Sequence, residues 1–462
     1  MSTEQRADPV TGRAAVLGRA ARTTFDVIVV GGGINGVGIL LDAATRGMRA
    51  LLVERDDLAV GTSSRSSKLI HGGLRYLEHR RVRLVREALA ERATLLRLAP
   101  HLVRLQRFVL PVAGPWWEPP YIGAGLSLYD LLGGRKGGSF RHIDRDELHR
   151  RIPALRLEGV RLAFAYSDGI TDDARYVVAV ARTAEALGAD VLTQAQVTGL
   201  TRHQASPRHV EILDRLDGGS HLLRTRAVVD ATGAFEADEP LFDTGGHIVL
   251  SRGSHLILRR EAVAGTVGLT LRVPGRVVFL VPWLGSWMLG TTDVTHEGEV
   301  GSPRPTADEV RYLLDVASEA LEVPIDRADV VGGFAGIRPL VGSPQDTTTT
   351  ADLSREHRIV EPVSGLLAVR GGKFTTYRRV AAEVVDRVAA HLGRTGRSQS
   401  ASVSLVGAAP RASLASIASD LVARGIEPEV AWSLAQRHGT EARDVARVVV
   451  AQGLTARLVP DT

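Results

Sequence analysis

Apolar runs and amphipathic stretches alternate along the N-terminal part of the chain. The apolar run FDVIVV, residues 25–30, leads into the glycine-rich stretch GGGINGVGILLDAATRG, and the next apolar run, in RALLVERDD, ends on the acid Glu54. Short apolar runs that alternate with helical patterns are typical of βαβ units in a parallel sheet. The pattern therefore predicts a strand, a glycine turn, a helix and a second strand at the start of an α/β domain.

The same alternation returns further along the chain. It predicts a helix from about Asp173 to Leu187, strands near 190–194 and through Val197, and a strand in RAVVDATGA that ends at Ala231-Thr232-Gly233. Later, a strand in GLLAVRGG precedes a long helix. The nucleotide fold is thus interrupted and resumes, whereas an NAD enzyme usually continues with a second compact βαβ half. This interleaving favours FAD over NAD.

Residues 235–336 are rich in β-branched and aromatic residues between glycine and proline. The runs HIVLSRGSHLILRR, GRVVFLVPW and SWMLGTTDV predict strands. The stretch TADEVRYLLDVASEAL predicts an amphipathic helix that begins with a capping box of Thr306 and Glu309. We expect these elements to form a substrate cap that covers the flavin.

Together the patterns predict an α/β fold with an α+β cap. It combines a Rossmann domain that binds FAD, an interleaved antiparallel-sheet substrate cap and a short helical C-terminal domain. The expected boundaries are an N-terminal extension at 1–24, the FAD-binding domain at 25–234 with cap segments interleaved around 100–165, the cap domain at 235–336, the returning FAD-binding segment at 337–392 and the helical domain at 393–462.

Composition narrows the classes of function. The 462 residues are 44% hydrophobic, which is enough for sizeable cores. The absence of cysteine excludes disulfides, thiolate metal sites and cysteine nucleophiles, and we expect no bound metal. The first 24 residues lack the apolar core of a signal peptide, and no apolar run is long enough to cross a bilayer. We therefore expect a cytoplasmic protein, or one at the periphery of a membrane.

The charge balance favours an anionic partner. The net charge is +5 and the isoelectric point is about 9.8, which suits nucleic acid, an acidic membrane or a phosphorylated substrate. Because the basic residues are scattered and no RNA-recognition or zinc-finger pattern occurs, we expect no nucleic acid. Of 57 basic residues only Lys68, Lys136 and Lys373 are lysines. Since a compact ammonium differs from a planar guanidinium, Lys68 and Lys373 are candidates for lysines that the function requires.

The glycine turn matches a dinucleotide fingerprint. Gly31, Gly33 and Gly36 fit G-x-G-x-x-G, in which the glycines permit a tight turn and the close approach of a pyrophosphate. Glu54, at the end of the second predicted strand, stands where a carboxylate accepts hydrogen bonds from the adenosine ribose.

Longer motifs are more specific. In chain order they are VGGGINGVGILLDAATRG, GTSSRSSKLIHGGLRYLE, SDGITDDARYVVAVARTAEALGA, LGTTDV, FAGIRPLV and RGGKFTTYRRVAAEVVDRV. With them the chain resembles, from about Phe25 to His391, the FAD-dependent, quinone-linked glycerol-3-phosphate dehydrogenases. The resemblance implies a glutathione-reductase-like fold with FAD as cofactor. It also implies that C2 of sn-glycerol 3-phosphate passes a hydride to FAD N5 to give dihydroxyacetone phosphate, and that a quinone accepts the electrons at the inner face of the cell membrane.

Several alternatives remain open at this point. Another FAD oxidoreductase of the same fold, such as an amine or 2-hydroxyacid oxidase, would keep the cofactor motifs, and so would a flavin-binding homologue without activity. The electron acceptor is a quinone or another molecule, and a homodimer is one option for assembly.

The resemblance also assigns residues. It places Arg75 and Arg338 in the substrate pocket, with Tyr76 and Lys373 at neighbouring family positions, and an arginine fork suits a phosphate dianion. His255 is a further candidate for the substrate pocket. The residues expected to contact the cofactor are Gly31, Gly33, Asn35, Gly36, Glu54, Arg55, Thr62, Ser63, Ser64, Ser67, Lys68, Gly73, Val197, Thr232, Gly233, Gly372, Lys373, Phe374 and Thr375.

Four residues are candidates for the chemistry itself. His71 has the pKa range of a general base for the C2 hydroxyl proton, although a histidine that bonds the flavin or the backbone is an equal interpretation. His255 is a second candidate base. Arg338 is too basic to accept a proton but stabilises a developing alkoxide, and Lys373 belongs to the same group by resemblance.

Two regions depart from the family pattern. The family signature ATGPW reads Ala231-Thr232-Gly233-Ala234-Phe235 here, so local packing should differ, and the C-terminal domain looks short, which leaves its usual contacts open.

Trp116, Trp117 and Tyr121 follow a basic stretch, as is typical of a membrane interface. Alternatively, Leu84, Ala88, Leu95 and Leu98 belong to an ordinary packed helix.

Overall fold

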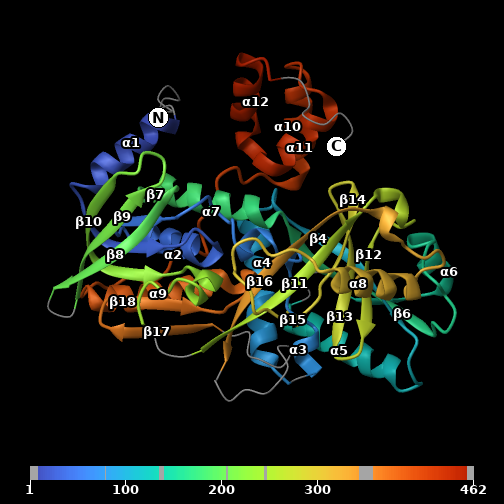
Figure 1. The fold of residues 1–462 in the computed structure, drawn as a ribbon. Helices are drawn as coiled ribbons and strands as arrows, with labels where there is room; N and C mark the ends of the chain where they lie inside the picture. The colour runs from blue at the N-terminus through green and yellow to red at the C-terminus, as the bar shows by residue number, and fades with distance from the viewer. Residues whose placement is uncertain are drawn as a thin grey trace.

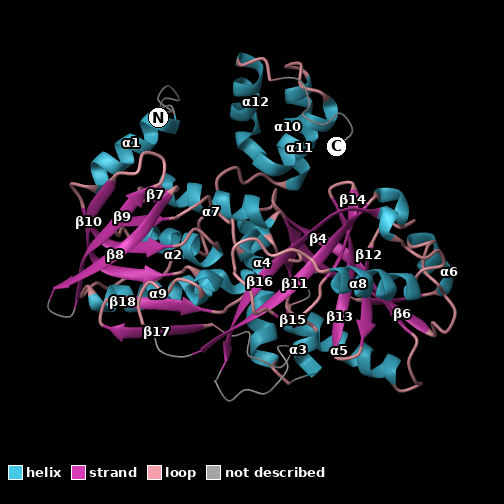
Figure 2. Cartoon of the chain, viewed as in Figure 1, coloured by secondary structure: helices cyan, strands magenta, loops and turns pink. Residues whose placement is uncertain are grey.

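The chain forms two β-sheets side by side, with helices on their faces and a separate helical unit at the C-terminus (Figures 1 and 2). The computed structural model describes residues 9–78, 80–134, 140–203, 206–243, 247–342 and 357–454. Among the described residues no helix combines the length and the apolar character that a membrane span requires.

The first sheet carries the glycine turn. Its strand order is β17-β18-β10-β1-β2-β7, with β9 on β10 and β8 on β9. The central pairs are parallel, whereas β17 with β18 and the β8–β9–β10 meander are antiparallel. The strands are β1 (Thr24–Val30), β2 (Ala50–Val53), β7 (Asp190–Leu192), β8 (Ala195–His203), β9 (Ser206–Asp214), β10 (Ser220–Asp230), β17 (Arg358–Val363) and β18 (Leu366–Arg370).

Helices bury one face of this sheet. Val27 and Val29 of β1 pack in one core with buried residues of α2 (Ile34–Thr45), α7 (Asp173–Ala186) and α9 (Tyr377–His391). The other face packs against the meander and α1 (Pro9–Ala20). Arg13 of α1 donates to the carbonyls of Thr193 and Gln194 at 3.1 Å each, so the described part of the expected N-terminal extension, from residue 9, is docked on the sheet.

The second sheet is the expected cap. Its order is β15-β11-β14-β13-β12-β4-β6-β3, with β16 on β11 and β5 on β6. One pair, β12 with β4, is parallel and departs from the antiparallel arrangement that we expected. Its strands are β3 (Leu69–Ile70), β4 (Val103–Val112), β5 (Arg141–Ile143), β6 (Leu162–Thr171), β11 (His247–Leu258), β12 (Gly268–Val273), β13 (Arg276–Trp283), β14 (Ser286–Gly290), β15 (Val294–Thr295) and β16 (Val330–Gly342).

The cap sheet draws on three stretches of the chain, which carry β3, then β4 to β6, and then β11 to β16. β4, β5 and β6 come from the segment expected around 100–165, and β16 continues the cap sheet to Gly342, beyond the expected boundary at residue 336. α8 (Ala307–Ala320) has the predicted capping box, in which Thr306 and Glu309 bond each other's backbone. Smaller elements of this region are α6 (Arg145–Arg151), η3 (Arg260–Ala262) and η4 (Arg327–Asp329).

The remaining elements join the two sheets or follow them. α4 (Val82–Leu98) buries Ala88, Leu95 and Leu98, so it is a packed helix. α3 (Arg75–Glu78) and α5 (Glu118–Leu132) lie beside the cap, and α10 (Arg411–Val422), α11 (Pro428–His438) and α12 (Ala442–Ala451) form a unit with its own apolar core. The short turns of 3₁₀ helix are η1 (Thr62–Ser64), η2 (Gly233–Ala237), η5 (Phe374–Thr376) and η6 (Gly439–Glu441).

Candidate functional site

A cavity of about 1390 Å³ lies where the two sheets meet. One part is lined by residues at the carboxyl ends of β1, β2, β10 and β18, and the other by cap residues such as Tyr166, Thr270 and Phe279. In open parallel sheets, ligands bind at the carboxyl ends of the strands. The cavity is therefore the candidate active site.

The glycine turn forms the wall of the cavity between β1 and α2. Gly31 has a φ of +110°, and a Cβ there would lie 2.6 Å from the carbonyl oxygen of Ala231. A Cβ on Gly36 would lie only 1.9 Å from the carbonyl oxygen of Gly31. Gly36 does not itself line the cavity. Because Gly36 has no side chain, α2 packs directly against the turn. The turn therefore stays tight, and a dinucleotide can come close to its backbone.

Glu54 stands at the end of β2 and faces the cavity. Its Oε2 accepts a hydrogen bond of 2.5 Å from the Gly32 N–H, and its Oε1 accepts one of 2.8 Å from the Asp56 N–H. Burial raises the pKa of Glu54, and the two backbone hydrogen bonds oppose that change. The carboxylate is thus held at the place where a ribose hydroxyl would reach it.

The serine-rich loop, residues 62–68, crosses from one sheet to the other. The Ser63 hydroxyl accepts a hydrogen bond of 2.9 Å from the Ile34 N–H at the start of α2, and Thr62 Oγ1 donates at 2.6 Å to the Ile337 carbonyl of β16. Thr62, Ser63 and Ser67 line the cavity.

Lys68 and Ser64, which we expected to contact the cofactor, are not among the residues that line the cavity. Lys68 Nζ instead lies 2.5 Å from Asp173 Oδ1 and donates to the Ser64 carbonyl at 2.5 Å. The physical reason is charge pairing, because a buried ammonium needs a carboxylate within reach. In this structure Lys68 therefore links the loop to Asp173.

Arg338 enters the cavity from β16 with its guanidinium oriented by β14 and the residues that follow it. Its NH2 donates to Thr291 Oγ1 at 3.1 Å, its NH1 donates to the Thr292 carbonyl at 3.4 Å, and NH1 lies 3.6 Å from Asp293 Oδ1. Opposite, a Cβ on Gly253 would lie 2.4 Å from the guanidinium. A glycine in β11 therefore makes the room in which Arg338 lies, and a quarter of the side chain stays exposed.

Lys373 and Tyr76 meet across the cavity wall. Lys373 Nζ lies 3.6 Å from the centre of the Tyr76 ring, which is a cation–π contact. Both residues line the cavity, as do His71 and Thr375, whose hydroxyl accepts a 3.3 Å hydrogen bond from the His71 N–H. The side chain of Arg75 lies outside the part of the chain that the structure describes.

The two candidate bases have different positions. His71 lines the cavity, whereas His255 is buried behind it, stacked on Phe334 with ring centres 4.8 Å apart and with Nε2 2.9 Å from Ser67 Oγ. Burial, followed by the charges of Arg338 and Lys68, lowers the pKa of His255 to about 3. His255 is therefore neutral near pH 7 and supports the wall, while His71 is the one of these two histidines that lines the cavity.

The other expected cofactor residues gather along the same cavity. The Asn35 side chain lies there with Nδ2 3.4 Å from the Gly371 carbonyl, and its buried Oδ1 has no hydrogen-bond partner among the described residues. Such an acceptor, together with the narrow glycine turn, fits a bound FAD. Further lining residues from the expected set are Gly33, Arg55, Gly73, Val197, Thr232, Gly233, Gly372 and Phe374.

The altered signature has a visible consequence. Phe235 lines the cavity where the family signature has tryptophan, and the Arg55 guanidinium lies 4.9 Å above its ring centre. Arg55 is also bonded to Glu239 at 3.1 Å. The shorter aromatic side chain is thus covered by an arginine from the end of β2.

Sequence reasoning missed a buried group beside His71. Asp168 lines the cavity, and its Oδ1 accepts hydrogen bonds from Arg92 at 2.5 Å and from the Tyr129 hydroxyl at 2.8 Å. That hydroxyl in turn accepts the Gly72 N–H at 2.7 Å. Asp168 stands in the motif SDGITDD, but its partner Arg92 lies in a distant helix that no local pattern connects to it.

Comparison with known proteins identifies the class. The family profile described as FAD dependent oxidoreductase matches residues 26–387. The chain belongs to the FAD-dependent oxidoreductases, and FAD as the cofactor is confirmed. It is also 40% identical over 440 residues to the glycerol-3-phosphate dehydrogenase of Mycobacterium leprae, across 94% of this chain and 75% of that protein. Within the class it belongs to the glycerol-3-phosphate dehydrogenase family.

Solved structures agree with this assignment. The glycerol-3-phosphate dehydrogenase from Bacillus halodurans, complexed with FAD, matches with a TM-score of 0.78 and 27% identity over 94% of this chain and 79% of that chain. The L-alpha-glycerophosphate oxidase from Mycoplasma pneumoniae, with FAD bound, matches with a TM-score of 0.63 and 15% identity over 79% of this chain and 95% of that chain, and supports the fold alone. The expected flavoprotein fold is confirmed.

Proposed function

We propose that this chain oxidises sn-glycerol 3-phosphate to dihydroxyacetone phosphate. When bound, FAD supplies the acceptor for the hydride that leaves C2. The observation that carries the proposal is the position of Arg338, whose oriented and partly exposed guanidinium lies in the same cavity as the glycine turn. A cation with five N–H donors in such a place suits a phosphate dianion or a developing alkoxide.

The chain's own residues divide the work around the substrate. Arg338 and Arg75 bind the phosphate or the oxygen at C2, and Lys373 adds a compact positive charge close to Tyr76. His71 accepts the C2 hydroxyl proton, because it faces the cavity and its backbone is fixed by Thr375. The ring of His255 stays behind the wall and keeps Ser67 in place.

The first experiment is anaerobic addition of glycerol 3-phosphate to the purified yellow protein, which should bleach the flavin. Acid should release FAD unchanged, because we expect it to be bound without a covalent link. Bleaching by glycine or lactate, with none by glycerol 3-phosphate, would instead favour an amine or 2-hydroxyacid oxidase. A protein that carries FAD but is reduced by none of these would be an inactive homologue.

A second experiment tests the phosphate clamp. Arg338→Ala and Arg75→Ala should each lower kcat/KM for glycerol 3-phosphate by at least about tenfold, because each loses a charge-assisted hydrogen bond. Glycerol, which lacks the phosphate, should be a poor substrate that loses much less. Arg311→Ala, on the exposed face of α8, serves as the control. Equal fractional losses for both substrates would contradict the clamp.

We also propose that a quinone accepts the electrons at the inner face of the cell membrane. The support is geometric, since Tyr121 and Leu128 of α5 line the cavity and are also exposed at the surface, next to the exposed Trp116 and Trp117. An apolar quinone would therefore reach the cavity from a lipid surface. Faster reoxidation of the reduced enzyme by a soluble quinone than by oxygen is the expected result, and the reverse order would contradict it.

A further inference from the structure

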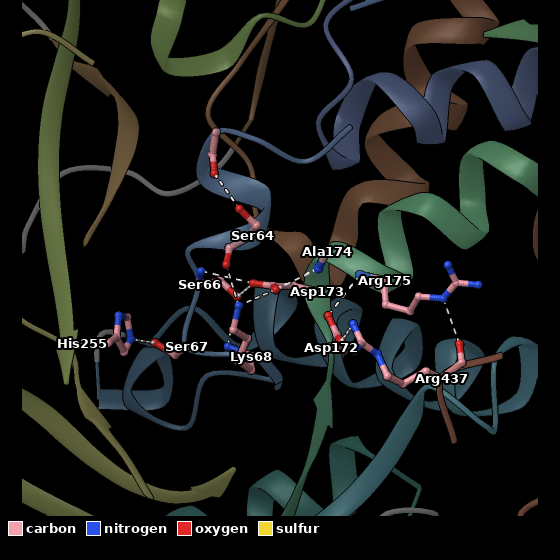
Figure 3. A network of polar contacts seen from close by, with 11 residues as sticks. Ser64, Ser66, Ser67, Lys68, Asp172, Asp173, Ala174, Arg175, His255 and Arg437 are labelled. Atoms are coloured by element: carbon pink, nitrogen blue, oxygen red, sulfur yellow. Dashed lines mark hydrogen bonds and ion pairs between the residues drawn. The ribbon is translucent and has the colours of Figure 1, made fainter. Parts of the chain in front are cut away.

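The serine-rich loop is wound around one buried carboxylate, that of Asp173 at the first residue of α7 (Figure 3). Asp173 is fully buried. Its Oδ1 lies 2.5 Å from Lys68 Nζ, and its Oδ2 accepts hydrogen bonds from the Ser66 hydroxyl at 2.6 Å and from the Ser66 N–H at 3.2 Å. Three donors from one loop thus converge on one side chain of a helix that lies 105 residues away in sequence.

The loop needs this partner to keep its shape. Lys68 adopts a left-handed backbone with a φ of +61°, a conformation that costs an L-residue about 1–2 kcal/mol. The Lys68 N–H donates to the Ser66 hydroxyl at 3.0 Å, and Lys68 Nζ also donates to the Ser64 carbonyl at 2.5 Å. Because ion pairs in a protein interior add little net stability, the value of this one lies in geometry.

What the ion pair fixes is a residue of the cavity wall. Ser67, between Ser66 and Lys68, lines the cavity, and its Oγ lies 2.9 Å from His255 Nε2 (Figure 3). His255 stacks on Phe334 of β16, the strand that carries Arg338. Lys68 Nζ lies 5.3 Å from the centre of the same Phe334 ring. The carboxylate of Asp173 therefore connects, through contacts within 6 Å, to the wall on which Arg338 is mounted.

We propose that Asp173 is a positioning residue for the reaction: it sets the place of the Ser67 hydroxyl, and through it the orientation of the His255 ring behind the substrate face. Asp173 does not line the cavity, so it acts through Ser67 and not by contact with substrate or cofactor. The inference rests on the proposed function for its kinetic consequence, but its structural consequence, the hydrogen bond of His255, is measurable without turnover.

The experiment compares Asp173→Asn, Ser67→Ala and the double variant, all as purified FAD-loaded protein. The matched control is Asp42→Asn, which breaks the ion pair that the fully buried Asp42 of α2 makes at 2.7 Å with Arg46, the residue after the helix. Two quantities are measured: the limiting rate of flavin reduction by glycerol 3-phosphate, and the ring ¹⁵N resonances of His255, assigned by their loss in His255→Gln. If Asp173→Asn does not fold, Lys68→Gln takes its place, since it removes the same link from the other side.

The expected result has three parts. Asp173→Asn and Ser67→Ala each slow flavin reduction by about tenfold and shift the His255 resonances in the same direction, and the double variant is no slower than the slower single variant. Asp42→Asn lowers Tm without either effect. A rate within about twofold of wild type and unshifted His255 resonances in Asp173→Asn would overturn the proposal, and so would fully multiplicative losses in the double variant. If glycerol 3-phosphate fails to reduce the wild type, the proposed function fails, and the His255 resonances alone decide for or against Asp173.

Discussion

At the scale of single residues, Lys68 and Lys373 have different kinds of partner. Lys68 closes an ion pair with Asp173, whereas Lys373 Nζ is buried against the Tyr76 ring, 3.6 Å from its centre. A guanidinium is larger and planar, so it does not fit at that distance in the same orientation. We expect Lys373→Arg to lower kcat/KM by about tenfold with FAD content unchanged. Steady-state kinetics would check this, with the exposed Arg83→Lys as the control. Activity within about twofold of wild type would make Lys373 incidental.

At the scale of elements, we expect the junction between α11 and α7 to lose stability in acid. Arg175 of α7 donates from Nε to the Arg437 carbonyl at 2.9 Å and from NH2 to His438 Nδ1 at 3.0 Å. Burial, followed by the positive charge of Arg175, lowers the pKa of His438 to about 4. Arg437 and Arg182 lower it further, whereas Glu441 opposes them. Burial and the charge of Arg175 also lower the pKa of His101 to about 4. Between pH 6.5 and 4 the unfolded chain therefore binds protons that the folded chain does not, so stability falls as the pH drops through this window. We expect the urea midpoint to decline from pH 7 to pH 5, and to decline less in His438→Gln. The exposed His142→Gln should behave as wild type, and an unchanged decline in His438→Gln would contradict the prediction.

At the scale of the whole molecule, the exposed aromatic surface beside α5 has no cover within the described chain. Trp116 is 78% exposed and Trp117 is 52% exposed, and the net charge of +5 favours anionic lipid. Moving such rings from water into the membrane interface should contribute a few kcal/mol, so replacing both Trp116 and Trp117 by serine should weaken binding to phosphatidylglycerol vesicles by at least about tenfold. Vesicle flotation measures this. Trp432→Ser, at the 42% exposed tryptophan of α11, is the matched control, and equal flotation of all three proteins would count against membrane contact.

Local patterns predicted the elements whose signal lies within a few turns of chain. The strand before Gly31, the α2 helix and the α8 capping box follow from periodicity and cap residues alone. Helix α1 was not predicted, because Gly12 and Gly18 weaken its helical pattern and its stability comes from docking on the sheet.

Sequence patterns could not predict which residues of distant segments contact one another. Pairing of Ser251 with Arg338 puts β16 into the cap sheet, and the Lys68–Asp173 ion pair joins two segments 105 residues apart. Both depend on tertiary register, which sequence spacing does not encode. The family motifs nevertheless predicted that His71, Arg338 and Lys373 share one cavity. Such motifs identify residues that meet in the folded family members, although they do not explain how the chain brings them together.

The order in which the cavity is completed has a consequence for the life of the protein in the cell. The glycine turn leaves the ribosome early, yet β1 must wait for β10, in the register of Thr24 with Arg224, and the sheet closes only when β18 joins β10. Residues as late as Thr375 line the space for FAD, so the complete site for the cofactor forms only after most of the chain has been made. Since a ligand that binds only the folded state stabilises it by mass action, the supply of flavin should govern how many newly made chains escape proteolysis. A cell short of riboflavin would then lose this enzyme as protein, and not only as activity.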